Sequence, residues 1–175
     1  MITEIEVAKN SKEYEDFLPL YLSAFPQEER ISVDDLFIKS EGRELVACYE
    51  EDEFVGFYAT LTVKDITHII YFAVPDKLRN KGIGSKILTL ISNRYADKRI
   101  ILDIEAEDET SENNEQRKRR KAFYLRNGYK ESEVEYIWRG VPYNILINKG
   151  NITDKEFWGF WDVIEKIRNK KDCRW

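Results

Sequence analysis

Residues 67–105 contain a strand, a helix and a second strand in succession, and this unit limits the possible folds more than any other segment. Residues 99–105 form an almost unbroken apolar run, which is typical of a strand buried on both faces of a sheet. A turn with two glycines and an amphipathic segment from Gly82 to about Tyr95 come before this run. Because a helix of this kind connects parallel strands, we expect a β-α-β crossover at the centre of the sheet.

The rest of the chain adds strands and helices around this crossover. Apolar periodicity and turn residues predict strands at 2–7, 44–49, 54–63, 67–74, 99–105, 133–138 and 143–147. They predict helices from Ser11 to Pro26 and at 32–40, 82–95, 115–127 and about 154–170, the last capped by Thr153 or Asp154. We find no internal repeat and no linker. The pattern predicts one α/β (α+β) domain over residues 1–175, with a mixed, mostly antiparallel twisted sheet and flanking helices.

Charge and composition exclude several classes of protein. Lys and Arg total 28 and Asp and Glu 33, giving a net charge of −5, so tight non-specific binding to nucleic acid is disfavoured. Aromatic residues make up 13% of the chain, which supplies enough apolar area for a folded core. We expect a cytoplasmic protein without a membrane segment, because the chain has no signal-peptide pattern and no apolar run of about 20 residues.

The two cysteines, Cys48 and Cys173, are far apart in the sequence and lack the spacing of metal ligands. We therefore expect two reduced thiols and no bound metal.

The segment Arg79-Asn-Lys-Gly-Ile-Gly-Ser85 follows a predicted strand and opens a predicted helix. Gly82 and Gly84 allow the backbone to approach a ligand closely, and the unpaired amides of the first helical turn attract negative charge. Arg79 and Lys81 add cationic side chains. The segment therefore predicts a pyrophosphate site, the alternative being a glycine-rich helix start that binds nothing. It lacks the Gly-Lys-Ser/Thr of the NTPase phosphate loop and the third glycine of the dinucleotide fingerprint.

A second motif, Phe123-Tyr124-x-x-x-Gly128-Tyr129, ends the predicted helix at 115–127. Together with Arg79-x-x-Gly82-x-Gly84, in this order and around the strand at 99–105, it resembles the GCN5-related N-acetyltransferase (GNAT) family. The resemblance extends in element order from about residue 44 to residue 147. It implies a GNAT-like fold and an acetyltransferase that uses acetyl-CoA.

The resemblance also implies which residues contact the coenzyme. In the family, the strand before the signature diverges from its neighbour and pairs with pantetheine. Here that strand contributes Phe72, Ala73 and Val74, and we expect the Val74 N–H to stabilise the oxyanion. The implied pyrophosphate site consists of Arg79, Asn80, Lys81, Gly82, Ile83, Gly84 and Ser85.

The family's tyrosine near the CoA sulfur corresponds to Tyr124. Because an ordinary phenol has a pKa about 1.5 units above that of a thiol, we expect Tyr124 to donate a hydrogen bond to the developing thiolate. The alternative is an aromatic residue that only packs on the sheet.

The acceptor amine must lose a proton before it attacks, and several carboxylates could accept that proton. Glu28 and Glu29 lie in the segment where the family builds its acceptor site, while Asp103 and Glu105 end the central strand. The sequence does not rank Glu28, Glu29 and Glu105. His68, the one histidine, lies within a predicted strand, and we expect it to face the sheet rather than to act as a base.

One departure from the family concerns the second motif. Many relatives carry Asn and Ala seven and four residues before the tyrosine, whereas this chain has Arg117 and Arg120. A coenzyme contact by Asn113 or Asn114 could substitute. The basic face of this helix could meet the 3′-phosphate of CoA or an anionic substrate, or it could balance the acidic loop at 105–115. Its five-residue basic run is a weak indication of RNA binding.

The leading hypothesis is an enzyme that moves an acetyl group from acetyl-CoA to a primary amine of a small molecule or peptide, by direct attack in a ternary complex. The alternative is a non-catalytic acyl-CoA-binding sensor or assembly module. The aromatic cluster at 157–161 is expected to pack in the core or at a homodimer surface, and less strongly to form a wall of the acceptor site.

Overall fold

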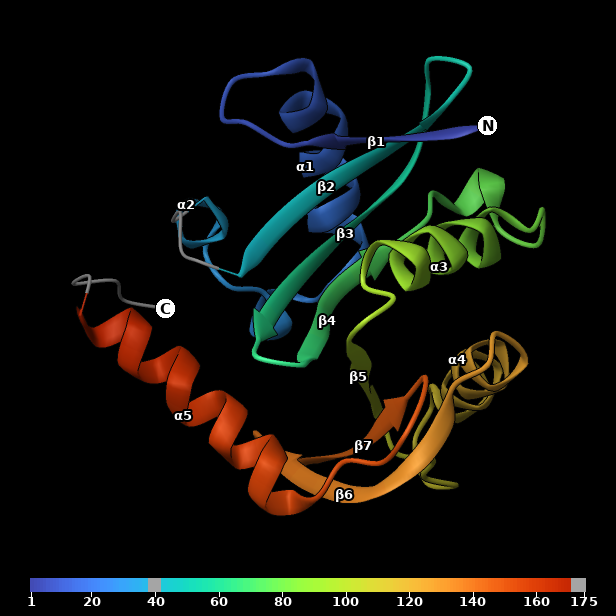
Figure 1. The fold of residues 1–175 in the computed structure, drawn as a ribbon. Coiled ribbons are helices and arrows are strands. Elements are labelled where there is room, and N and C mark those ends of the chain that lie inside the picture. The colour runs from blue at the N-terminus through green and yellow to red at the C-terminus, as the bar shows by residue number, and fades with distance from the viewer. Residues whose placement is uncertain (38–41, 171–175) are drawn as a thin grey trace.

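The computed structural model describes residues 1–37 and 42–170, in which seven strands form one sheet with helices on both faces (Figure 1). The strands are β1 (Ile2–Glu6), β2 (Arg43–Glu50), β3 (Glu53–Val63), β4 (Ile66–Ala73), β5 (Arg99–Glu105), β6 (Lys130–Trp138) and β7 (Val141–Ile147). The α-helices are α1 (Lys12–Ala24), α2 (Val33–Leu36), α3 (Ile83–Arg94), α4 (Asn114–Arg126) and α5 (Asp154–Lys170). Two short 3₁₀ turns are η1 (Gln27–Glu29) and η2 (Asp76–Leu78).

The sheet has the strand order β1-β2-β3-β4-β5-β7-β6. All neighbouring strands are antiparallel except β4 and β5, which are parallel and are joined by α3. In Figure 1, β1–β4 lie in the upper part of the view and β5–β7 in the lower part. The predicted α/β class, the mostly antiparallel sheet and the central β-α-β crossover are therefore confirmed.

The parallel strands β4 and β5 separate soon after they meet. They pair only where Ile66, Thr67 and His68 face residues 99–101. The register between β3 and β4 shifts at Ile70, which has no partner in β3, and such a bulge bends a strand. Beyond His68 the two strands therefore diverge, and we call the region between residues 69–73 and 102–105 the fork.

Three apolar clusters hold the layers together. The first packs α3, for example Ile87, on one face of the sheet, and the second packs α1, for example Tyr21, on the other face. The third packs Phe157 of α5 beside β5–β7. Alternate residues of β5 belong to different clusters: Ile100 lies in the first and Ile101 in the third. Because β5 is covered on both faces, its continuous apolar sequence is explained.

Several boundaries follow from local signals that the sequence predicts. Ser11 accepts a hydrogen bond from the amide of Tyr14 and caps α1. At the start of α5, Thr153 rather than Asp154 is the cap, because its hydroxyl accepts from the Glu156 amide at 3.3 Å. Gly128 follows α4 in the left-handed conformation, with a φ of 86°.

The second predicted helix, at 32–40, is shorter than expected. Its described part is a single turn, Val33–Leu36, and residues 38–40 lie outside the described residues. Cys173 also lies outside them, whereas Cys48 is a buried free thiol. Phe157 and Phe160 of the aromatic cluster are buried in the third apolar cluster, so the predicted core packing is confirmed for these two residues. Within the described part of the chain, no helix is both long and apolar enough to cross a membrane.

Candidate functional site

The first turn of α3 leaves its backbone amides without partners. Gly82 is the N-cap, with a φ of 79°, and the helix has no side-chain cap, in contrast to α1 with Ser11. The amide of Lys86 is the first to reach a carbonyl of this turn, that of Gly82, at 3.1 Å. Six amides before it donate to no described residue, namely those of Asn80, Lys81, Gly82, Ile83, Gly84 and Ser85. This end of α3 can therefore bind an anion through its backbone.

The side chains around this turn differ in their availability. The Arg79 guanidinium forms an ion pair with Asp76 at 2.7 Å, so an anion would have to compete with this carboxylate. The exposed Lys81 has no ion-pair partner among the described residues. A Cβ atom on Gly84 would lie 3.0 Å from the ring of Phe123, so this glycine also allows α4 to approach α3 closely.

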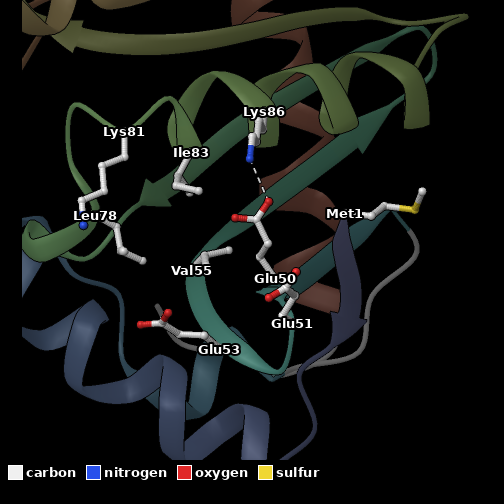
Figure 2. Close-up of a pocket in the computed structure, with 9 residues that line it drawn as sticks. All are labelled: Met1, Glu50, Glu51, Glu53, Val55, Leu78, Lys81, Ile83 and Lys86. Carbon is white, nitrogen blue, oxygen red and sulfur yellow. Dashed lines mark hydrogen bonds and ion pairs between the residues drawn. The ribbon is translucent and has the colours of Figure 1, made fainter.

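A surface pocket of about 380 Å³ borders the same turn and is lined there by Leu78, Lys81 and Ile83. Figure 2 shows three glutamates of the β2–β3 turn, Glu50, Glu51 and Glu53, on one side of this pocket and Lys81 and Lys86 on the other. Lys86 pairs with Glu50 at 2.8 Å. Because carboxylates and ammonium groups balance each other here, this pocket is a poor anion site compared with the amides at the start of α3.

The strand residues expected along pantetheine lie at the fork. Phe72 and Ala73 are the last two residues of β4, and Val74 lies just beyond the strand. Ala73 is buried and the other two are half-buried. The Phe72 ring stacks on that of Phe123 in α4, with centroids 6.5 Å apart. The amide of Val74 donates to no described residue, so it is available to a ligand in the fork.

Tyr124 projects from α4 into the same part of the molecule. Its side chain is almost fully buried and its ring packs against that of Tyr129 at 5.8 Å, but its hydroxyl has no hydrogen-bond partner among the described residues. Burial raises the pKa of Tyr124 to about 12, although the charge of Arg120 opposes this rise. The phenol is therefore protonated at neutral pH and can donate a hydrogen bond.

Glu105, at the end of β5, is already paired with two arginines. Its Oε1 lies 3.0 Å from Arg117 Nη2 and its Oε2 lies 3.4 Å from Arg120 Nη1. Arg117 also donates to the Ala106 carbonyl and to the side chain of Asn113. Glu105 thus holds α4 on the sheet, and its charge is compensated.

Two other basic residues of α4 have acidic partners as well. Lys118 pairs with Glu109 and Glu115, and Lys121 pairs with Glu107 and Glu131. The basic face of α4 could meet the 3′-phosphate of CoA, an anionic substrate or the acidic loop at 105–115. The ion pairs favour the last of these, neutralisation of the acidic loop. The side chains of Asn113 and Asn114 bond within the loop and the start of α4.

Glu29 and Glu28 lie in η1, which is fixed to β4 by the hydroxyl of Tyr71. This hydroxyl donates to the Glu29 carbonyl at 2.8 Å and accepts from the Ile31 amide at 3.0 Å. Burial, and then the charge of Glu105, raises the pKa of Glu29, and its carboxylate has no partner among the described residues. The side chain of Glu28 is exposed, and its carbonyl accepts from Arg139 of the β6–β7 turn.

Asp103 joins the site from β5 through a network that spacing does not reveal. Its Oδ1 lies 2.7 Å from His68 Nε2, and its Oδ2 accepts from the Tyr136 hydroxyl at 2.6 Å. Burial alone would raise the pKa of Asp103, but the hydrogen bonds from His68 and Tyr136 outweigh it and lower the pKa. His68 is a buried residue of the sheet, as predicted, and it packs against Trp161 of α5.

Sequence reasoning missed the tyrosines around these carboxylates. Tyr143 of β7 is 8% exposed, and its hydroxyl has no hydrogen-bond partner among the described residues. Burial raises the pKa of Tyr143 to about 12, and the charges of Glu29, Glu105 and Asp103 add to the rise. Its ring stacks on that of Tyr136, with centroids 5.4 Å apart. Alternation along β6 and β7 could have indicated which face these rings share, but not their neighbours.

The described residues contain no group of three or more His, Cys, Asp or Glu side chains arranged to hold a metal. These residues do include free backbone amides at the start of α3 and at Val74. Tyr124 and several carboxylates lie in the same part of the molecule.

Comparison with known proteins identifies relatives of this arrangement. A family model described as an acetyltransferase (GNAT) domain matches residues 41–131, just over half of the chain. A protein from Bacteroides thetaiotaomicron assigned to the GNAT family of acetyltransferases is similar in structure, with a TM-score of 0.76, 20% identity, and 95% of this chain and 96% of that chain covered. No curated protein matches the chain in sequence.

Two further solved structures bear on the ligands. The aminoglycoside 6′-N-acetyltransferase of Enterococcus faecium has a TM-score of 0.65 and 16% identity, over 87% of this chain and 99% of that chain. A GNAT family acetyltransferase of Elizabethkingia anophelis, with acetyl-CoA bound, has a TM-score of 0.57 and 16% identity, over 85% and 98%.

Proposed function

This chain belongs to the GNAT family of acetyltransferases, and on that premise we propose that it transfers an acetyl group from acetyl-CoA to a primary amine. The amine attacks the thioester directly while both substrates are bound. The observation that carries the proposal is the row of free amides from Asn80 to Ser85, placed beside a fork whose walls carry Tyr124 and Glu29.

The start of α3 and the fork fit the coenzyme. Free amides and the positive end of the helix dipole suit a pyrophosphate, and Lys81 adds a cation. The edge of β4 beyond His68 is not paired with β5 and can pair with the amides of pantetheine. The neighbour from Elizabethkingia anophelis contains acetyl-CoA, which supports the same donor here. Acetyl-CoA supplies the activated acetyl group.

Tyr124 acts as a hydrogen-bond donor to the leaving sulfur. With a pKa of about 12, its proton is held more tightly than that of a thiol, whose ordinary pKa is about 8.5. Full transfer to a thiolate would cost about 5 kcal/mol, so a hydrogen bond is the main contribution of this phenol. The free amide of Val74 donates to the carbonyl oxygen as negative charge develops there.

Glu29 accepts the proton of the acceptor amine. Among the carboxylates near the fork, its pKa is raised, whereas that of Asp103 is lowered and Glu105 is paired with two arginines. A base works best when its pKa approaches the working pH, so this environment favours Glu29. The aminoglycoside acetyltransferase among the neighbours acts on amines, which supports an amine acceptor here.

The test is to incubate the protein with acetyl-CoA and a panel of primary amines and to measure the free thiol released. We expect turnover with at least one amine. The variant Tyr124→Phe should lose most of this turnover, at least 10-fold, while calorimetry detects unchanged CoA binding. Tight CoA binding without thiol release from any amine would instead support the non-catalytic CoA-binding module. No binding of CoA at all would contradict both.

A further inference from the structure

Asp103 is a partly exposed carboxylate without a Lys or Arg partner among the described residues. Its side chain is 25% exposed, and its oxygens accept from His68 and Tyr136. His68 is 1% exposed, and its Nδ1 is buried without a hydrogen-bond partner. No Lys or Arg among the described residues forms an ion pair with Asp103.

A carboxylate this buried ordinarily has a cationic partner, because removing a charge from water is costly. Glu105, two residues further along β5, has two such partners, Arg117 and Arg120. Asp103 instead keeps a lone pair on each oxygen, and a quarter of its side chain is exposed at the β5 edge of the fork. This carboxylate therefore suits a cationic group of a ligand.

Tyr143 gives a second, independent indication of a ligand at the same place. Its side chain is more than nine-tenths buried, yet its hydroxyl has no hydrogen-bond partner among the described residues. Tyr143 pairs with Glu105 across β5 and β7, and Asp103 lies two residues from Glu105 on the same face of β5, so Tyr143 and Asp103 share that face. The Tyr143 hydroxyl is therefore free to form a hydrogen bond with a ligand. The stacked rings of Tyr136 and Tyr143 add an aromatic wall that suits a cation.

The reacting amine cannot be the partner of Asp103 throughout the reaction. An ammonium has no lone pair, so this nitrogen is neutral when it attacks, with its proton on Glu29. Asp103 would then have lost its ammonium partner. We propose that the acceptor carries a second cationic group besides the reacting amine, and that Asp103 and Tyr143 bind this second group at the fork. The inference rests on the proposed function and names its class of acceptor.

The experiment compares 1,4-diaminobutane with butylamine, which have the same carbon chain and differ in one amino group. Calorimetry on the folded protein saturated with CoA measures the affinity for each amine, and thiol release from acetyl-CoA measures turnover. We expect the wild type to bind the diamine at least 10-fold more tightly than the monoamine. Asp103→Asn should lower the diamine affinity about 10-fold and leave the monoamine affinity little changed. The exposed Asp162 of α5 provides the control, because Asp162→Asn makes the same charge change far from β5 in the sequence.

Tyr143→Phe keeps the test decisive if Asp103→Asn does not fold, because it removes only a hydroxyl without a partner. It should weaken diamine binding at least 3-fold. Equal affinity of the wild type for both amines, or a diamine preference that survives both substitutions, would overturn this inference whatever the turnover. Selective diamine binding with no acetylation of either amine would uphold the binding site and count against the proposed function.

Discussion

Arg117 of α4 and Glu105 of β5 form a buried ion pair, with 3.0 Å between Nη2 and Oε1 and side chains only 9% and 12% exposed. The same guanidinium donates to the Ala106 carbonyl at 2.8 Å and to Asn113 Oδ1 at 2.9 Å. Two contacts that fix α4 against the end of β5, those to Glu105 and Ala106, thus depend on one side chain. Since Tyr124 lies on the same helix, this pair also helps to position the fork.

Replacing Arg117 by alanine should destabilise the protein strongly. Glu105 would keep only longer contacts, to the exposed Arg120 at 3.4 Å and to the Asn113 side-chain amide at 3.5 Å, and would remain buried with its charge poorly compensated. Breaking a buried pair in this way costs about 3 kcal/mol or more of the free energy of unfolding. The control is Arg119→Ala, an exposed arginine of the same helix, which should change it by about 0.5 kcal/mol or less. Urea unfolding of the wild type and the two variants measures these changes in the free energy of unfolding. Equal changes in the two variants would show that the Arg117–Glu105 pair does not stabilise the fold.

The basic run on α4 shows where sequence reasoning reaches its limit. The spacing of Arg117, Arg120 and Lys121 correctly places them on one helix. Spacing alone does not show whether such residues bind an anionic ligand or pair with acidic residues of the same chain. Here the acidic partners lie in β5, the following loop and β6. By contrast, the succession of strands and helices along the chain, the crossover and the glycine turn depend on local pattern, and the structure confirms the succession and the crossover.

The contacts that sequence reasoning missed are made by the sheet. Asp103 and His68 are 35 positions apart and meet because β5 runs parallel to β4. Tyr143 faces Glu105 across the antiparallel pairing of β5 and β7. The preference for Glu29 over Glu28 likewise depends on burial next to Glu105, which adjacent positions in a polar segment do not reveal.

Gly82→Ala should weaken the binding of CoA by about 10-fold or more. The added methyl group would occupy open space beside the free amides, and the left-handed φ of 79° would strain the turn by about 1 kcal/mol. Gly140→Ala is the matched control, because Gly140 has a φ of 81° and equally open surroundings in the β6–β7 turn. Both variants should lose similar stability on heating, and calorimetry should detect weaker CoA binding only for Gly82→Ala. Equal CoA affinities would exclude this turn as the pyrophosphate site.

The ionisation of Glu29 should determine how kcat/KM rises with pH on the acidic side, or acidic limb, of its pH profile. A base is active only when it is deprotonated, and the pKa of Glu29 is raised above its ordinary value of 4.5. The rate constant kcat/KM should therefore rise with pH through a midpoint above 4.5, and Glu29→Gln should remove this limb and lower the rate by about 10²-fold or more.

Glu28→Gln makes the same chemical change at the neighbouring, more exposed position. If this variant removed the limb and Glu29→Gln kept it, the role would pass to Glu28. The comparison is made with one amine whose own pKa is known, so that its titration can be subtracted from each profile.

The start of α5 should contribute stability that depends on pH. Glu156 accepts from the amide and hydroxyl of Thr153, both at 2.9 Å, and pairs with Arg99 at 2.9 Å. The hydrogen bond from Arg99, followed by those from Thr153, lowers the pKa of Glu156 to about 2. Because the folded pKa is depressed, this stabilisation is fully present above the unfolded value of 4.5 and is lost as pH falls towards 2.

Since the side chain of Glu156 is partly exposed, we expect these contacts to add only about 0.5–1 kcal/mol to the free energy of unfolding. In urea unfolding, Glu156→Gln should be less stable than the wild type at pH 7 by this amount, and the difference should shrink as the pH is lowered from 4.5 to 2.5. A difference that stays constant over this range would show that Glu156 acts through packing and not through its charge.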